Sequence, residues 1–299
     1  MHGTIAANKA FDRSDLIIAL GTRFSDRVAL NPEKFGRRAR KVQIDIDASE
    51  INKNVVVDLG IAADVKEFLT ALLPLIKEKD HKDWISLATG WKKTTGDVKS
   101  SDAELHPSEI IEAVCRCTDK ETIYVTDVGQ HQMWAAQYLK HEHTKQFITS
   151  GGLGTMGFGY GAAIGAQMAF PENRVIHFTG DGSFHMNMNE ACTAVSENLP
   201  IITIIMNNTV LGMVYQWQTM FYGKRYSSTV PERQTDFAKV IEGFGGKGYR
   251  AETPAEFEEV FNKALKDNCP VWIDCHIAAN ECVYPMIPGG GTIEDMIIG

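Results

Sequence analysis

Residues 180–208 read GDGSFHMNMNEACTAVSENLPIITIIMNN. The stretch opens with Gly180-Asp181-Gly182 after the apolar run RVIHFT, and it closes with Asn207-Asn208 after a second apolar run, IITIIM. Helix-like residues lie between the two runs. The pattern predicts a βαβ unit whose two polar tips lie side by side at the carboxyl ends of its strands, where open α/β sheets bind ligands.

The two tips carry the chemistry of a site for Mg²⁺ and a diphosphate. Asp181 and Asn208 offer hard oxygen ligands, which suit Mg²⁺. Gly180 and Gly182 let the main chain approach a phosphate closely, and a helix expected from Ser183 adds its positive end. A lone GDG is more often a plain turn, but GDG and NN separated by 24 residues, each after a strand, form a far more specific signal.

Composition and charge exclude several classes of protein. The chain has 299 residues, of which 44% are hydrophobic and 23% charged, as in soluble globular proteins. A net charge of −8 argues against nucleic-acid or anionic-membrane partners. No apolar run is long enough to span a membrane, and the first residues lack the apolar core of a secretory signal. We expect a cytoplasmic protein if the source is bacterial, and organellar targeting stays open.

The six cysteines are scattered and none forms a C-x-x-C pair. Zinc sites and disulfide frameworks lack their usual spacing here. We expect reduced thiols.

The chain divides into two predicted α/β regions and a linker. Residues 1–78 contain apolar, β-rich runs at 15–21 and 41–47 and helical spacing at 65–76, which predicts a partial Rossmann-like domain with a small, exposed sheet. The chain is therefore expected to begin inside a domain. Residues 79–104 are polar and predict a linker with one short helix around Trp84.

The second region spans 105–285 and alternates strands with helices, which predicts a mainly parallel sheet flanked by helices. Its first helix has Pro107 in the first turn and Ser108 as a candidate cap. Further helices are expected from Leu211 and over 231–245. The tail, 286–299, predicts a loop with a short helix.

Several blocks resemble one family. The GDG…NN pair is similar to the thiamin diphosphate (ThDP) motif of thiamin-dependent enzymes. VGQHQMWAAQ (128–137), SGGLGTMGFGYGAAIGAQ (150–167), GMVYQWQTMFYGKRYS (212–227) and PMIPGGGTIEDMI (285–297) resemble the catalytic large subunit of acetohydroxyacid synthase, also called acetolactate synthase. MHGTIAAN, GTRFSDRV and IDIDASEINKN resemble that family's FAD-binding middle domain.

The resemblance implies a transferase that joins two pyruvate molecules, or pyruvate and 2-oxobutyrate, with loss of CO₂, in the biosynthesis of isoleucine, valine and other branched-chain amino acids. ThDP carries this chemistry and the protein positions it. FAD in the family is structural. A homo-oligomer (dimer or tetramer) and a small regulatory subunit are further implied, with no nucleic-acid or membrane partner.

The resemblance also implies site residues. Asp181, Asn208 and the backbone carbonyl of Val210 would hold Mg²⁺. Met156 would keep ThDP bent, and Met186 would pack on the thiazolium, although core packing is the alternative for either methionine. The full set of implied ThDP contacts is Val128, Gly129, Gln130, His131, Gly154, Met156, Gly180, Asp181, Gly182, Ser183, Met186, Asn208, Val210, Leu211, Gly212, Met213 and Val214. An ordinary histidine at a helix start is the alternative for His131.

In the first region, the FAD-contacting positions implied by the resemblance are Met1, His2, Gly21, Arg23, Val28, Asp45, Ile46 and Asp64. Ser25 stands where the family has Asp, which weakens that contact. Arg27 and Trp217 resemble residues that line the substrate channel. The alternative for Arg27 is an ordinary surface charge, and the alternative for Trp217 is packing in the core.

ThDP enzymes also need a glutamate that hydrogen-bonds N1′ of the aminopyrimidine and promotes its acid–base work. In this family it belongs to an N-terminal pyrimidine-binding domain, and neither Glu190 nor another Glu of this chain is assigned to that role, so the catalytic residue is unknown. Three hypotheses follow: a truncated enzyme that is inactive alone, half of a split enzyme that needs a separate pyrimidine-domain polypeptide, or a non-catalytic ThDP–Mg²⁺ binding module. A different ThDP-dependent carboligase, decarboxylase or oxidase is the alternative chemistry.

Overall fold

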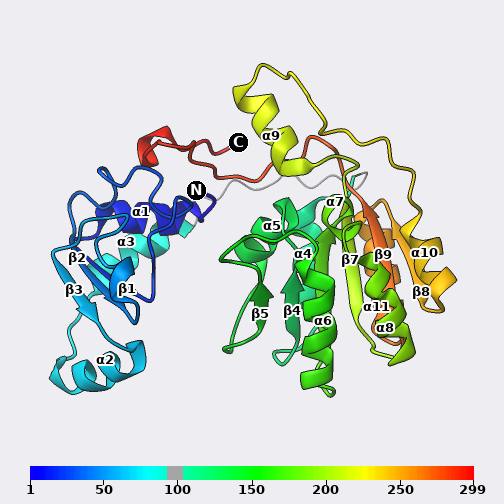
Figure 1. Ribbon diagram of the computed structural model, residues 1–299, viewed down its shortest axis with the longest axis horizontal. Coiled ribbons are helices and arrows are strands. Elements are labelled where there is room, and N and C mark those ends of the chain that lie inside the picture. Colours follow the sequence, from blue (N-terminus) through cyan, green and yellow to red (C-terminus); the bar gives the residue numbers. More distant parts are fainter. Residues whose placement is uncertain (93–103) are drawn as a thin grey trace. The chain divides into compact units, whose positions relative to one another are not determined.

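The computed structural model describes residues 1–92 and 104–299, which form two compact units (Figure 1). One unit combines the N-terminal segment with Tyr284–Gly299, and the other ends at Val283. The part of the expected linker at 93–103 lies outside the described residues. The helix expected around Trp84 is confirmed as α3 (Lys82–Lys92).

The N-terminal unit contains a three-stranded parallel sheet. Its strands are β1 (Leu16–Leu20), β2 (Arg40–Asp45) and β3 (Leu59–Ala62), in the order β1-β2-β3. Both predicted strands are confirmed, whereas β3 and helix α1 (Ile5–Arg13) were not predicted. Helix α2 (Val65–Leu72) ends earlier than expected and passes into the 3₁₀ turn η2 (Leu73–Leu75), which contains Pro74. A 3₁₀ turn, η1, spans Ala48–Glu50.

One face of this sheet is apolar and half-exposed. The register places Leu16, Ile18 and Leu20 of β1 on the same face as Ile44 of β2. Ile44 is fully buried, but Leu16 and Ile18 are each 49% exposed. The prediction of a small, exposed sheet is confirmed.

The C-terminal segment belongs to the N-terminal unit rather than forming a separate tail. The amide of Ile287 donates to the carbonyl of Met1 (3.0 Å), and Met286 pairs with Ile297 in an antiparallel bridge. The segment begins at Tyr284, two residues before the expected boundary, and contains the 3₁₀ turn η4 (Ile293–Asp295).

The second unit is built on a six-stranded, wholly parallel sheet, which confirms the predicted α/β class. Its strands are β4 (Ile123–Thr126), β5 (Phe147–Thr149), β6 (Val175–Gly180), β7 (Ile202–Asn207), β8 (Lys247–Ala251) and β9 (Val271–His276). They lie in the order β5-β4-β6-β7-β9-β8. Strands β5 and β8 were not predicted, because β5 is short and β8 is largely polar.

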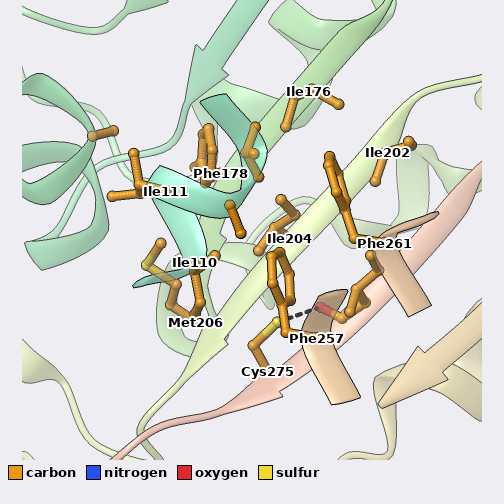
Figure 2. Packing of buried hydrophobic residues seen from close by; sticks show 14 of the residues in the cluster. Ile110, Ile111, Ile176, Phe178, Ile202, Ile204, Met206, Phe257, Phe261 and Cys275 are labelled. Atoms are coloured by element: carbon orange, nitrogen blue, oxygen red, sulfur yellow. Dashed lines mark hydrogen bonds between the residues drawn. The ribbon is translucent and has the colours of Figure 1, made fainter. Parts of the chain in front are cut away.

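Helices cover both faces of this sheet, as alternate residues of its central strands require. On one face, α4 (Pro107–Cys117), α5 (Gln130–Tyr138) and α11 (Pro254–Ala264) bury a cluster that includes Phe178, Ile204 and Phe261 (Figure 2). On the other, α6 (Phe158–Ala169), α8 (Ala191–Ser196) and α10 (Phe237–Phe244) bury Tyr160 and Trp272. These two cores fix the strand ends at which the candidate site lies.

Three helix starts differ from the predictions. Helix α4 is capped by His106, with Glu109 completing a capping box, and not by Ser108. The helix expected from Ser183 begins at Asp181 as the single turn α7 (Asp181–Phe184), followed by η3 (Met188–Glu190) and α8. Helix α10 starts only after the cap residue Asp236, so 231–235 are not helical. The helix expected from Leu211 is confirmed as α9 (Gly212–Phe221), with Leu211 as its N-cap residue.

Candidate functional site

The candidate site lies where the strand order of the second unit reverses. The chain passes from β4 outward to β5 and then returns to β6 on the other side of β4, so the segments after β4 and β6 leave in opposite directions. Such a switch point is where open α/β sheets bind ligands. Asp127, Val128 and Gly129 follow β4, and Asp181 follows β6. The expected position of the site therefore agrees with the sheet topology.

The two asparagines after β7 point to different partners. The Nδ2 group of Asn207 donates to Asp274 Oδ1 (3.0 Å). The Nδ2 group of Asn208 donates to Gln130 Oε1 (3.2 Å), while its Oδ1 accepts the amide of Val210 (3.2 Å). Asn208 is thus held between the start of α5 and its own turn, with an oxygen lone pair left for a further partner.

The start of α9 lies directly on this pair of amides. A β-carbon at Gly212 would lie 1.9 Å from Gln130 Oε1 and 2.8 Å from Asn208 Nδ2, so only glycine fits. At Gly157, a φ of +85° requires glycine as well. Its amide donates to Asp127 Oδ1 (2.8 Å) and Ser183 Oγ (3.2 Å), which places the glycine-rich turn against α7.

Asp181 is a buried carboxylate with an unusual ionisation. Burial raises its pKa to about 6, against the opposing effects of the Arg233 guanidinium and the Gly182 amide. It borders a pocket of about 260 Å³ that is also lined by His185, Arg233, Arg250 and His276. A buried carboxylate whose charged form is disfavoured by desolvation is a good ligand for a divalent cation, which would replace the lost hydration.

His131 presents a second unsatisfied group at the switch point. Burial lowers its pKa to about 4, against the opposing effect of Asp127, so the imidazole is neutral at pH 7. Its Nε2 atom is buried and has no hydrogen-bond partner. A buried polar atom without a partner costs free energy unless a ligand satisfies it. Together with the desolvated carboxylate of Asp181, it fits a diphosphate–metal group.

Two residues of this site were not predicted. Asp127 is fully buried and accepts the amides of Gly157 and Val128, so it joins the glycine-rich turn to the end of β4. Gln216 of α9 is buried and bonded to Gln130. An Asp immediately after the strand TIYVT was a signal that could have identified the first. Nothing in the spacing of YQWQ distinguishes Gln216 from its neighbours.

The remaining predicted ThDP residues differ in exposure and in local contacts. Met186 is 58% exposed, and it lies close to Gly157. Met156 and Val214 are partly exposed as well, whereas Val210 is buried. Gly154 adopts a positive φ near Val128, and the amide of Leu211 donates to the carbonyl of Thr229. Met213 packs against the core.

Among residues 1–92 and 104–299, no three His, Cys, Asp or Glu side chains are placed to hold a metal ion. The predicted Mg²⁺ set has one carboxylate, one amide and one carbonyl, so that finding does not bear on it. All six cysteines are free thiols, as expected. No helix of the described parts of the chain is long and apolar enough to cross a membrane.

The predicted FAD residues separate into two groups. Met1, His2 and Val28 line a pocket of about 270 Å³ in the N-terminal unit, together with Arg27 and Phe35. The other predicted residues do not line that pocket: Gly21, Arg23, Asp45, Ile46 and Asp64. Asp64 caps α2, which gives its carboxylate a structural role.

The two predicted channel residues are both accessible. Arg27 pairs with Asp26 (3.0 Å) on the surface of the N-terminal unit. Trp217 lies on α9 beside Phe221, with the rings edge-on and their centroids 5.2 Å apart. Trp217 is half-buried, whereas the neighbouring Gln216 is the fully buried residue of this helix.

Comparisons with known proteins place both units of the chain within one group of enzymes. Residues 127–275 match the family model described as thiamine pyrophosphate enzyme, C-terminal TPP binding domain, and residues 1–72 match the central domain of the same enzymes. The chain is 39% identical to the acetolactate synthase large subunit of Haemophilus influenzae over 100% of its own length and 53% of that protein. It is 42% identical to the large subunit of Lactococcus lactis (99% and 52%) and 40% identical to the acetolactate synthase of Mycobacterium bovis (99% and 50%). The chain thus spans about half the length of these relatives.

Proposed function

Because the chain belongs to the thiamine pyrophosphate enzyme family and corresponds to the C-terminal part of acetolactate synthase large subunits, we propose that it is the cofactor-binding part of an acetolactate-forming enzyme. The observation that carries the proposal is the group at the switch point of the second unit. There a desolvated carboxylate (Asp181), an oriented amide (Asn208) and an unpartnered imidazole (His131) lie at the ends of neighbouring strands.

In this proposal Asp181, Asn208 and the carbonyl of Val210 hold Mg²⁺. Within the described part of the chain, the Oδ1 atom of Asn208 accepts one hydrogen bond, from Val210, and an amide oxygen has a second lone pair for the cation. The positive charge of Mg²⁺ favours the ionised form of Asp181. The ion, held by Asp181 and Asn208, would supply positive charge to neutralise a bound diphosphate.

The diphosphate itself is bound by the residues around the metal ligands. The neutral His131 can donate one N–H to a phosphate oxygen from Nε2, which satisfies that buried atom. Gln130, Gly129, Gly180, Gly182 and Ser183 line the same strand ends. The glycines let the main chain come close.

When bound, ThDP supplies an electron sink for carbon–carbon bond formation between 2-oxo acids. The chain's contribution is to orient it and to exclude water. Met156, Met186 and Val214 offer exposed apolar side chains that a bound cofactor would cover. We propose pyruvate and 2-oxobutyrate as substrates, with Trp217 and Arg27 as channel residues.

FAD is proposed to bind the N-terminal unit. The pocket lined by Met1, His2 and Val28 combines apolar walls with cationic side chains, which suits a flat ring system that carries phosphates. Gly21, whose φ is +61°, lies at the carboxyl end of β1, the usual position for a nucleotide contact in an α/β sheet.

The partners are proposals as well. The relatives are named large subunits, which supports a small regulatory subunit as a partner, and a homo-oligomer is proposed in addition. They carry about as much sequence again outside the matched half. This supports a pyrimidine-binding domain as the source of the activating glutamate.

The cofactor proposal is tested by calorimetric titration of the purified chain with ThDP and MgCl₂. We expect saturable, Mg²⁺-dependent binding that Asp181→Ala abolishes, because the variant lacks the only carboxylate ligand. Glu197→Ala, which removes an exposed carboxylate of the same unit, is the control. Undiminished affinity in Asp181→Ala contradicts the metal assignment. Acetolactate formation from pyruvate, measured with and without the N-terminal half of a relative, then tests the reaction.

A further inference from the structure

Three buried amide side chains form a continuous hydrogen-bonded row behind the predicted metal ligand. They are Asn208, after β7, Gln130, at the start of α5, and Gln216, on α9. Their relative exposures are 6%, 4% and 1%. An amide has one donor end and one acceptor end, so each contact in such a row constrains the orientation of the next.

The row begins at the main chain of Val283. The amide N–H of Val283 donates to Gln216 Oε1 (2.9 Å), and Gln216 Nε2 donates to the carbonyl of Val283 (3.1 Å). A backbone N–H can only donate and a backbone carbonyl can only accept. This two-point contact therefore permits one orientation of the Gln216 amide.

The orientation passes from Gln216 to Gln130. Gln216 Oε1 accepts from Gln130 Nε2 (3.0 Å), and the same nitrogen donates to the carbonyl of Glu281 (2.8 Å). With its nitrogen committed to two acceptors, Gln130 turns Oε1 toward Asn208. That oxygen accepts from Asn208 Nδ2 (3.2 Å).

The end of the row fixes which atom of Asn208 is available to a metal ion. Because Nδ2 is directed to Gln130, Oδ1 lies on the other side, where it accepts the Val210 amide. A reversed amide would present a nitrogen that carries hydrogens and cannot ligate Mg²⁺. Gly212 leaves no free space beside the Gln130–Asn208 contact.

We infer that Gln216 is a positioning residue that transmits the orientation of the Val283 main chain through Gln130 to Asn208 and so keeps Asn208 Oδ1 directed to Mg²⁺. The inference rests on the proposed function, because it concerns the same metal site. Gln216 is not one of the proposed metal ligands and acts on Asn208 through Gln130. Through hydrogen bonds, Gln216 connects α9 and the segment at 281–283 to the proposed metal ligand Asn208.

The test compares Gln216→Leu, Gln216→Glu and Gln167→Leu with the unaltered chain by calorimetric titration of ThDP at several MgCl₂ concentrations, alongside thermal melts. Gln216→Leu removes the hydrogen bonds from Gln216 to Gln130 and to the main chain of Val283, and we expect about 10–100-fold weaker Mg²⁺ affinity, as for other residues that orient metal ligands. Gln216→Glu, protonated when buried, keeps one donor and one acceptor and should restore affinity to within about threefold. Gln167, on α6, is also buried, and among the described residues it donates to the main-chain carbonyls of 170, 171 and 173 in the turn after that helix, so Gln167→Leu is the matched control.

If the loss of Mg²⁺ affinity is proportional to the loss of melting temperature in all three variants, Gln216 has only a structural role and the inference is overturned. Unchanged affinity in Gln216→Leu, or equal weakening in Gln216→Leu and Gln216→Glu, would also overturn it. If the unaltered chain binds no ThDP with Mg²⁺, the proposed function itself fails. That result is distinct from all of the others, since it appears without any substitution.

Discussion

At the scale of single residues, the second unit keeps two histidines uncharged beside its site. Burial lowers the pKa of both His131 and His177 to about 4, although Asp127 opposes the shift in each case. His177 packs between Tyr160 and Phe184, and its Nε2 atom is buried without a partner. The unfolded chain binds protons at these imidazoles near pH 6.5, whereas the folded chain does so only near pH 4.

The free energy of unfolding should therefore fall as the pH drops from about 6.5 to about 4, by up to ~1.4 kcal/mol per pH unit for each buried imidazole. In this window the unfolded state holds more protons, so acidification favours unfolding. His177→Leu should reduce the pH dependence of the free energy of unfolding by the contribution of one imidazole. Urea denaturation at a series of pH values measures this dependence. An equal slope in His177→Leu and the unaltered chain would contradict the assignment.

At the scale of elements, the ends of helices decide which residues reach the site. Helix α11 begins with Thr253, whose hydroxyl accepts the amide of Glu256 (3.3 Å), while the Glu256 carboxylate accepts the amide of Thr253 (3.3 Å). This capping box holds the helix that carries Phe257 and Phe261 onto the sheet (Figure 2). Asp236 caps α10 in a similar way and leaves 231–235 free to place Arg233 beside Asp181.

Thr253→Ala should lower the free energy of unfolding by about 1 kcal/mol, the usual cost of losing an N-cap side chain. Thr253→Ser keeps the hydroxyl and should lower the free energy of unfolding by less than about half of that amount. Chemical denaturation of the three proteins under one condition decides the matter. Equal loss in the Ala and Ser variants would show that the methyl group, and not the cap, is the stabilising part.

At the scale of the whole molecule, the chain returns to the N-terminal unit after completing the second one. Met286 is fully buried and Ile287 is 7% exposed, and Asn31 donates to the carbonyl of Gly290 (3.0 Å). The described part of the N-terminal unit contains a small cluster of buried apolar residues around Phe24 and Val55. The returning segment adds the buried side chains of Met286 and Ile287 to this unit.

Deletion of 284–299 should increase amide hydrogen exchange in α1 and β1 and leave β6 and β7 protected, since local stability follows local burial and hydrogen bonding. Deletion of 298–299 alone removes the half-exposed Ile298 and should have little effect. Exchange that accelerates equally in both units after the longer deletion would refute the assignment of this segment to the N-terminal unit.

Sequence by itself determined the fold class and the position of the site. The long apolar runs of β4, β6, β7 and β9 are buried on both faces, and local composition is enough to identify such strands. Two of these strands are followed by the turns GDG and NN, and these turns alone indicated Asp181 and Asn208 as candidate ligands. The glycines at 157 and 212 were also evident in the sequence, but the contacts that require glycine at these positions were not.

Tertiary structure alone decided the rest, because the deciding interactions join residues that are distant along the chain. The short strand β8 is stabilised by its pairing with β9, and the one-turn α7 by the close fit of Ser183 to Gly157. Gln216 lies 86 residues from Gln130 and 67 from Val283. No local pattern encodes that row of amides; only the folded sheet brings its members within hydrogen-bonding distance and so sets the orientation of Asn208.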